Sequence, residues 1–337
     1  MPVPPPTTAK SQPTPAARRA RAPAARRARA PAARRAPAAA ARRAPAAAAA
    51  RRAPAAAARR APAAAARRAA AAARRSSGGA AGSSGSCAPS NWPTSSTVGI
   101  PSTTPALKVI ANSLHTKADG EVYDAVDLQA RLYVDHKNVT IKRSRLQGDQ
   151  YYAVYTTIAD SHLTIEDSEI VGGVLPTNYF TARRNHIHAP AGGSKNDGFA
   201  FAASNVLIED NLIDGLSGSS GAHLDGIQTM AGSNIVLRHN WIEAVSPPIS
   251  GGGVNAAIFF SPNKGPISDV TVECNMLIEK DGYYPLRIYS VDGSVVVRHN
   301  RWQKGFLGTA PVGLKGQTSI SEWTDNAYDD GTPIASP

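Results

Sequence analysis

The stretch Val139-Thr-Ile141-Lys-Arg-Ser144-Arg-Leu146 decides the fold, because its pattern returns along the chain. Two apolar residues alternate with polar ones, a Ser or Asn follows, and another apolar residue closes the unit. Further copies span 163–170, 180–187, 206–213, 235–242, 270–277 and 295–302, and a worn copy surrounds Asn326. Their starts are 24, 17, 26, 29, 35 and 25 residues apart. Such spacing indicates a repeat architecture, and alternation within each unit indicates strands.

Units this short leave no room for a long helix, so the sequence predicts an all-β, right-handed parallel β-helix of about seven to nine coils. Three positions of the repeat support in-register stacking. The residue after the second apolar position alternates in sign: Lys142, Glu166, Arg183, Glu209, Arg238, Glu273, Arg298. The turn position reads Ser144, Ser168, Asn185, Asn211, Asn240, Asn275, Asn300, and the closing apolar position reads Leu146, Ile170, Ile187, Ile213, Ile242, Leu277, Trp302. Like charges stacked directly would repel, so we interpret all three columns as structural.

With these columns the repeats resemble the right-handed parallel β-helix proteins of the pectate-lyase-like superfamily, over about residues 105–337. The resemblance implies a solenoid that polysaccharide lyases, glycoside hydrolases, phage tail depolymerases and non-enzymatic surface proteins share. It therefore implies the fold more specifically than the activity.

The charge of the chain is unevenly distributed. Residues 1–76 hold 18 arginines and Lys10 without any acid, in a repeat of Arg-Arg-Ala-Pro-Ala-Ala-Ala-Ala. Residues 77–337 contain the remaining 18 basic residues and all 25 acidic residues, which gives them a formal charge of −7. The net charge of +12 of the whole chain therefore comes from the N-terminal tract. Proline interrupts every helical run, and we expect a disordered polycation that binds anionic cell-wall polymers or other polyanions. An uninformative coding repeat is the alternative. No specific nucleic-acid recognition is expected from the folded part.

The domain organisation follows from these shifts in composition. We expect a disordered tract at 1–76, a Ser/Gly/Pro-rich linker at 77–105 and the β-helix at 106–337. No apolar run is long enough for a transmembrane helix, and no secretory signal is recognisable. Cys87 and Cys274 are the two cysteines, and either one bridge or two unpaired thiols is compatible with that number. We expect a monomer, and by analogy of fold an extracellular one.

Each coil also contains a second strand. Aligning these strands puts Phe199, Ile227, Ile258, Leu286 and Leu314 inward, with their neighbours Ala200, Gln228, Phe259, Arg287 and Lys315 on one outward face. A slip of one residue in the later coils would reverse that face. Loops rich in Gly, Ser and Pro precede the strands and are expected to form one wall of a groove for a chain-like substrate.

The densest polar cluster lies along this predicted groove. We expect Asp197, His223, Asp225 and Arg287 to be catalytic and Lys195, Gln228, Tyr284 and Lys315 to bind substrate. Asp197 and Asp225 occupy equivalent positions of neighbouring coils, about 5 Å apart. In β-elimination from a uronate polymer, a cation neutralises the sugar carboxylate and a base removes the C5 proton. Arg287, Lys195 or Lys315 could supply the cation or the base, and the two aspartates could instead hold Ca²⁺.

Hydrolysis is the alternative chemistry, with Asp197 and Asp225 as an acid and base pair. The order Asn196-Asp197-Gly198, Asp225, Arg287-Ile288 resembles the polygalacturonase-like glycoside hydrolases, although Gly226 stands where that family has a second aspartate and the Gly-His-Gly segment near Asn255 is absent. Asp-Gly before a strand is also an ordinary turn signal. The sequence thus predicts action on an acidic polysaccharide, with lyase chemistry preferred, then hydrolysis, then non-catalytic binding or surface attachment.

Overall fold

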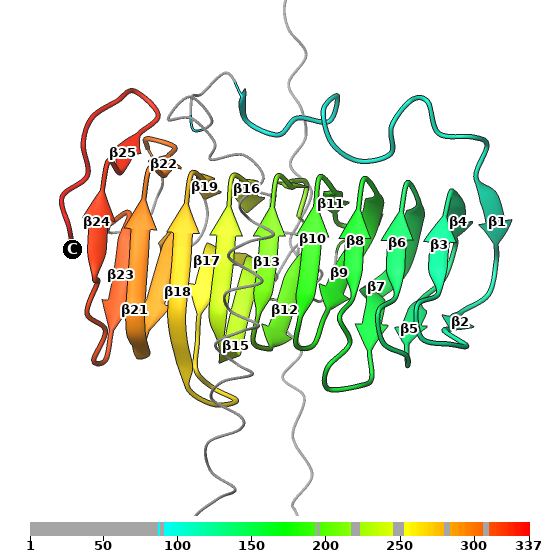
Figure 1. Cartoon of the computed structure of the whole chain (residues 1–337). Helices are drawn as coiled ribbons and strands as arrows, with labels where there is room; N and C mark the ends of the chain where they lie inside the picture. The colour runs from blue at the N-terminus through cyan, green and yellow to red at the C-terminus, as the bar shows by residue number, and fades with distance from the viewer. Residues whose placement is uncertain are drawn as a thin grey trace, which may run out of the picture. The chain divides into compact units, whose positions relative to one another are not determined.

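The structure is a computed structural model that describes residues 87, 91–191, 193, 196–216, 223–244, 253–279, 284–305 and 310–337. The chain divides into two units, Met1–Arg75 and Ser76–Pro337. The basic tract predicted at 1–76 and Lys195 lie outside the described residues. The described part of the second unit is all-β, and its strands pair in parallel from coil to coil (Figure 1).

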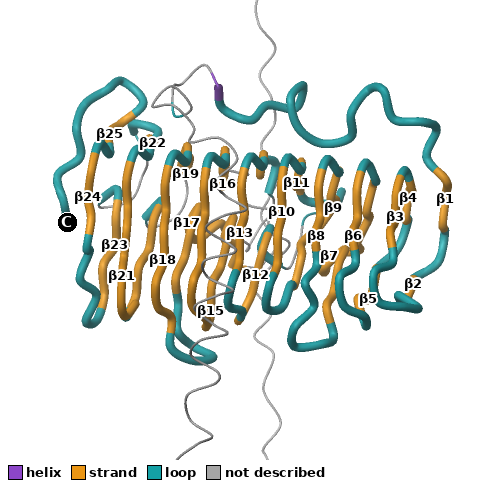
Figure 2. The backbone as a smooth tube through the Cα atoms, in the orientation of Figure 1, coloured by secondary structure: helices purple, strands orange, loops and turns teal. Residues whose placement is uncertain are grey.

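The strands form three ladders that run the length of the solenoid (Figure 2). We call the first the charge-ladder face: β3 (Val122–Asp124), β6 (Thr140–Lys142), β8 (Thr164–Glu166), β10 (Phe180–Arg183), β13 (Val206–Glu209), the second half of β15 (His223–Arg238), β18 (Ile267–Glu273), β21 (Val291–Arg298) and β24 (Glu322–Thr324). The nine strands of this face match the upper end of the predicted number of coils.

We call the second ladder the strap face, and its strands come directly after the asparagine turn of each coil. It consists of β1 (Lys108–Ile110), β4 (Val126–Leu128), β7 (Arg145–Thr156), β9 (Glu169–Leu175), β11 (His186–His188), β14 (Leu212–Ile213), β16 (Trp241–Ala244), β19 (Met276–Glu279), β22 (Arg301–Trp302) and β25 (Ala327–Tyr328). The third ladder, the site face, consists of β2 (Leu114–His115), β5 (Leu132–Val134), the later parts of β7 and β9, β12 (Phe199–Ala202), the first half of β15, β17 (Gly253–Phe260), β20 (Leu286–Tyr289) and β23 (Val312–Lys315).

The turn between the charge-ladder and strap faces is built from two residues per coil. The first adopts a left-handed conformation, with φ of +57° at Asp210 and +52° at His239. The second is the predicted Ser or Asn, which is buried in every coil. Asn211 donates through its backbone N–H and Nδ2 to Oδ1 of Asn240, each at 3.0 Å, and Asn240 does the same to Asn275. The predicted asparagine column is confirmed. The hydrogen bonds of its side-chain amides compensate the conformational free energy that the left-handed residue costs.

The predicted charge column is also confirmed in its register. Lys142 pairs with Glu166, Glu209 with both Arg183 and Arg238, and Glu273 with Arg298, in consecutive coils. Glu209 accepts from both neighbouring arginines, and Glu273 lies 2.7 Å from Nη2 of Arg298. In the neighbouring turn position, His239 pairs with Asp210 at 2.6 Å and His299 with Asp325 at 3.0 Å, so these histidines also join consecutive coils.

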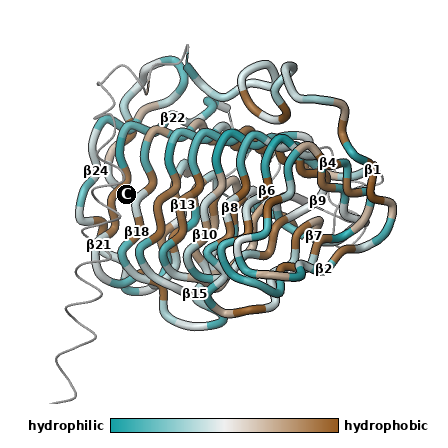
Figure 3. Tube along the Cα trace, turned by 45° about the vertical axis from the view of Figure 1, so that its right-hand side comes forward, coloured by the Kyte–Doolittle hydropathy of each residue, from teal (hydrophilic) through white to brown (hydrophobic). Residues whose placement is uncertain are grey.

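The core lies inside the coils and consists of stacked apolar columns. The closing apolar residues from Leu146 to Trp302 are fully buried, as predicted. Figure 3 shows hydrophobic and hydrophilic residues alternating along the tube. Five large side chains on the inner surface, Phe180, Phe199, Phe201, Phe260 and Trp302, are also fully buried. The stacking of one coil on the next thus supplies the hydrophobic stabilisation of the fold.

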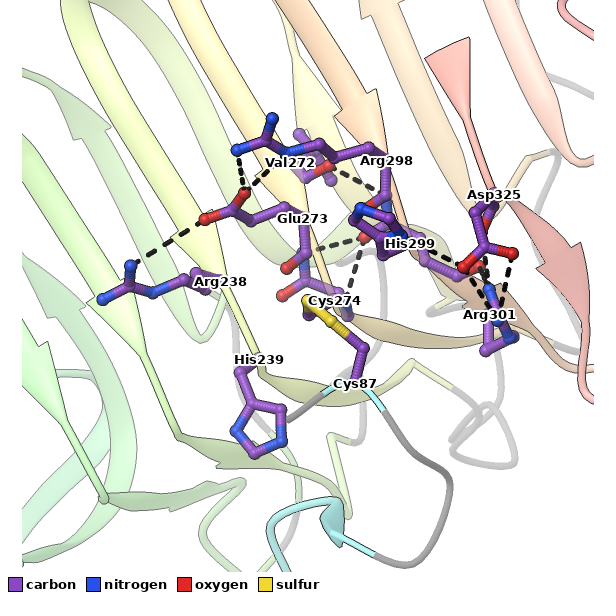
Figure 4. Close-up of a disulfide and its surroundings, with 12 residues drawn as sticks. Cys87, Arg238, His239, Val272, Glu273, Cys274, Arg298, His299, Arg301 and Asp325 are labelled. Atoms are coloured by element: carbon purple, nitrogen blue, oxygen red, sulfur yellow. Dashed lines mark hydrogen bonds and ion pairs between the residues drawn. A yellow bond between two sulfur atoms is a disulfide. The ribbon is translucent and has the colours of Figure 1, made fainter. Parts of the chain in front are cut away.

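The segment expected to be a linker, 77–105, packs against the strap face in part of its described length. Cys87 forms a disulfide with Cys274, which occupies a left-handed turn position (Figure 4). Trp92 is buried, packs with Met276 and Ile278, and stacks on His239 with ring centroids 5.6 Å apart. We call residues 91–107 the strap. The cysteines, for which the sequence left two readings, are therefore bonded.

Candidate functional site

The site face brings Asp197 and Asp225 together, in neighbouring coils. Phe199 pairs with Ile227 in the parallel register, which makes the two aspartates equivalent positions. The backbone N–H of Asp225 donates to Oδ1 of Asp197 at 2.7 Å. Nδ2 of Asn255, one coil further, donates to Oδ1 of Asp225 at 3.1 Å. A chain of polar contacts thus crosses three coils at the beginning of the site-face strands.

Both carboxyl groups are removed from water, because Asp197 is 7% and Asp225 1% exposed. Burial raises the pKa of Asp197 from 3.8 to about 7, against the hydrogen bond from Asp225. Burial also raises the pKa of Asp225 well above its ordinary value, and the charge of Asp197 raises it further, while Arg287 and Asn255 oppose the shift. Burial and the proximity of the two groups thus both favour the protonated form, which is the form that a general acid requires.

Arg287 extends the polar chain to the outer surface. Its Nη1 donates to Oδ1 of Asn255, and its Nη2 donates to the hydroxyl of Tyr289 at 2.7 Å. The guanidinium carbon lies 4.3 Å from the ring centroid of Phe259 and 5.0 Å from that of Tyr289. Stacking and two hydrogen bonds fix the guanidinium plane in one orientation, which favours recognition of a planar anionic group such as a carboxylate.

Lys315 corrects one detail of the predicted alignment. Arg287 pairs with Gly313, and Lys315 pairs with Tyr289, so the last strand is shifted by two residues from the predicted register. A shift of two keeps Lys315 on the expected outer face, where its Nζ lies 5.5 Å from the ring centroid of Tyr289. Leu314, expected to be buried, is 37% exposed, since no described strand stacks beyond β23 on this face.

The other predicted residues lie outside the chain of polar contacts that links Asp197, Asp225, Asn255 and Arg287. His223 is exposed at the start of β15, and no hydrogen bond or ion pair joins it to the described residues. Gln228 is half-buried between Ala200 and Phe259 in the register, on the outer face. Tyr284 covers Gly313, where a Cβ atom would lie 2.7 Å from Cδ2 of its ring. Most of the predicted loop wall lies outside the described residues.

Gly226 shows why a second aspartate is not accommodated beside Asp225. A Cβ atom at Gly226 would contact Cγ2 of Ile242 and lie 2.6 Å from the carbonyl oxygen of Ala257. Both neighbours belong to the packed coil, so the backbone must move before any side chain fits. The backbone of this coil therefore has no room for the second aspartate that the resemblance to polygalacturonase-like hydrolases would require at Gly226.

The aspartate pair does not fit the proposed calcium ligation. Among the described residues, no group of three or more His, Cys, Asp or Glu side chains could hold a metal ion. One oxygen of each carboxyl group already accepts a hydrogen bond, and the positive charge of Arg287 acts on Asp225. Ca²⁺ takes about six to eight oxygen ligands, and these contacts compete with it.

Sequence reasoning missed Tyr289, Asn255 and Tyr152 as members of the site. Tyr289 lies two residues after Arg287, and the period of two that places both on one face was the signal for it. Asn255 follows a loop, and nothing local marks it as the link between Asp225 and Arg287. Tyr152 lies beside Asp197, because a Cβ atom at Gly173 would contact both the Asp197 carbonyl oxygen and the Tyr152 ring, and burial together with the Asp197 charge raises its pKa.

Comparison with known proteins agrees with this architecture. The family model for a right-handed β-helix region matches residues 131–302, just over half of the chain. The chain belongs to the right-handed β-helix family. No curated protein and no solved structure matches it. Family membership favours a carbohydrate-active or polysaccharide-binding protein. It does not identify the reaction, which has to be inferred from the residues of the site. In the part that the structure describes, no helix has the length and apolarity needed to span a membrane.

Proposed function

We propose that this protein acts on an acidic polysaccharide, by β-elimination, on the outer surface of the site face. One observation carries the proposal: Arg287 lies against the rings of Phe259 and Tyr289, which contact each other edge to face, and its guanidinium is oriented by Asn255 and Tyr289. Lys315 adds a second cation one coil further. Cations on consecutive coils suit a polymer with a carboxylate on each sugar.

The chemistry requires three roles. Arg287 pairs with the sugar carboxylate, which acidifies the C5 proton by stabilising the charge that develops when it leaves. A base beside Arg287 takes that proton, and the side chains of Tyr289 and Lys315, in their deprotonated forms, are the candidates for this role among the described residues. The C4–O bond then breaks, the departing oxygen takes up a proton, and an unsaturated sugar remains. Asp225 lies too deep to touch the polymer and acts on Arg287 through Asn255.

The test is to incubate the full chain with a panel of acidic polysaccharides and to follow two readouts together. A lyase produces ultraviolet absorbance from the unsaturated sugar, with new reducing ends in equal amount. Arg287→Ala should reduce both signals on charged polymers, and the matched variant Arg301→Ala, on the strap face, should not. Absence of either signal on every polymer, together with retained binding, would favour the non-catalytic reading.

Hydrolysis remains the second candidate because of the raised pKa of Asp197. A carboxyl group that titrates near neutral pH is suited to general acid catalysis, and the Asp197–Asp225 pair supplies two such groups. In that case reducing ends appear without ultraviolet absorbance. Hydrolysis also requires the substrate to reach a carboxyl group that is almost fully buried, and this is why we place it second.

We further propose that the protein acts outside the cell, with the basic tract as an anchor. The Cys87–Cys274 disulfide supports an oxidising location, because such bonds persist mainly in secreted proteins. The 18 arginines of residues 1–76 would bind anionic wall polymers by charge. Adhesion should weaken steeply with added salt, and changing these arginines to glutamine should abolish it. Adhesion that is unaffected by either change would contradict the anchor.

A further inference from the structure

A second polar cavity lies on the strap face, outside the site described above. It has a volume of about 480 Å³, is open to solvent, and is lined by strap residues between 95 and 107 on one side and by Arg145, Glu169 and His186 on the other. These three residues are consecutive in the register of β7, β9 and β11. The volume falls within the range of about 300–1,000 Å³ that is typical of small-molecule sites.

The strap is held at a fixed position over this cavity. The backbone N–H of Gly99 donates to the carbonyl of Arg184 at 2.9 Å. Gly99 has a φ of +83°, and a Cβ atom there would lie 3.3 Å from Cβ of His186. Only glycine combines that conformation with so close an approach. The Trp92 cluster and the disulfide fix the other end of the strap.

The groups in the cavity have hydrogen-bonding capacity left over. Arg145 uses Nε for Glu169 at 2.7 Å, and its two Nη groups have no hydrogen-bond partner among the described residues. His186 uses Nε2 for Asp214 at 2.7 Å, which leaves Nδ1. The buried hydroxyl of Thr104 has no partner in the described part of the chain.

The charge of Glu169 does not exclude an anion from this cavity. One carboxylate oxygen accepts from Arg145, and the other lies 3.2 Å from Nε2 of His188. These two bonds lower the pKa of Glu169 to about 2 and raise that of His188, so the carboxylate stays ionised and both of its oxygens are occupied by donors. The Nη groups of Arg145 are therefore left as the cationic donors of the cavity.

The remaining wall is a mixture of hydroxyl and apolar side chains. Ser95, Ser102 and Thr104 are the hydroxyl-bearing residues of the lining, and Val98, Ile100 and Leu107 are among its apolar residues. A sugar presents hydroxyl groups at its edge and apolar C–H groups on its faces, and a uronic acid adds the carboxylate that suits Arg145. We propose that this cavity, on the strap face, is a second binding site and that its ligand is a short acidic saccharide. The inference does not depend on catalysis at Arg287.

Calorimetric titration of the full chain with a trisaccharide of galacturonic acid tests the inference. We expect two classes of site, of which Arg145→Ala removes one, with affinity falling about tenfold or more for loss of a charge-assisted hydrogen bond. The matched control is Arg301→Ala, in the same outward column of the strap face, where Arg301 pairs with Asp325. Arg287→Ala should remove only the other class.

Each outcome separates the two proposals. Binding that Arg287→Ala abolishes and Arg145→Ala leaves unchanged would overturn the second site and keep the proposed function. Binding that Arg145→Ala abolishes and Arg287→Ala leaves unchanged would keep the second site and overturn the proposed function. Equal affinity for the neutral galactose trisaccharide would overturn the acidic specificity. If Arg145→Ala lowers the thermal midpoint, Ser102→Ala serves in its place, because it removes an exposed hydroxyl of the lining and no ion pair.

Discussion

Asn211 and Asn240 on one side of the solenoid, and Asp197 and Asp225 on another, are pairs of polar side chains buried in neighbouring coils. The asparagine column repeats without interruption to Asn326, because an amide both donates and accepts and each one satisfies the next. A carboxylate can only accept. The aspartate column therefore ends after two residues, with Ala256 in the next coil.

The two pairs also differ in the direction of their hydrogen bonds. In the asparagine column, the backbone N–H of each coil donates forward to the next side chain. At the aspartates, the N–H of the later coil donates back to the earlier carboxyl, from Asp225 to Asp197. Asparagine thus stabilises the stack at no electrostatic cost, whereas the aspartates carry mutual repulsion that raises the pKa of Asp225. Stored repulsion of this kind is typical of functional sites and not of structural ladders.

The sharpest difference between the pairs is their response to pH. Asp197 has a folded pKa of about 7 against 3.8, so the folded state retains a proton that the unfolded state loses. The contribution of this retained proton to the free energy of unfolding is fully present below about pH 4. It declines as the pH rises to about 7, by at most about 4 kcal/mol. Chemical denaturation at pH 4.5 and 7.5 should show a smaller decline in Asp197→Asn than in the wild type. Equal declines would mean that the carboxyl group is not buried in solution.

Breaking the asparagine column should cost almost as much. Asn240→Ala leaves the N–H and Nδ2 of Asn211 and the carbonyl of Ile208 without their partner. We expect a loss of about 3 kcal/mol in the free energy of unfolding, as two or more buried groups lose hydrogen bonds. Urea denaturation measures it. Asn263→Ala, at an exposed turn, is the matched control and should be nearly neutral.

The aspartate pair should show the opposite behaviour. Asp225→Asn keeps the shape of the side chain and removes the carboxyl group that accepts from Asn255, so the orientation of Arg287 is lost and turnover should fall at least about 100-fold while the thermal midpoint stays unchanged or rises. Initial rates on the preferred acidic polymer and a thermal scan measure the two effects. A variant that is silent in both assays would assign Asp225 to turn formation.

The fold was predictable from the sequence because it repeats. Seven copies of one pattern fix the register, and the alternating signs from Lys142 to Arg298 exclude a slip of one coil. The equivalence of Asp197 and Asp225 follows from the same alignment. The contact between Asn255 and Arg287 does not, because it depends on side-chain reach across a loop of irregular length. The strap likewise depends on a pairing of Cys87 with Cys274, which are 187 residues apart, that no local pattern encodes.

The smallest expected effect concerns the charge column. Glu209→Lys would place a cation between Arg183 and Arg238, both of which pair with Glu209. We expect a loss of about 1 kcal/mol or more in unfolding free energy, because the ion pairs are lost and like charges stack at the spacing of the coils. The control is Glu322→Lys at the more exposed end of the column, where Arg298 lies 3.4 Å away and solvent screens the pair. Added salt should restore part of the lost thermal midpoint in Glu209→Lys. An unchanged midpoint at low salt would mean that charge alternation is not what holds the coils in register, and would leave the asparagine column as the sole polar determinant of stacking.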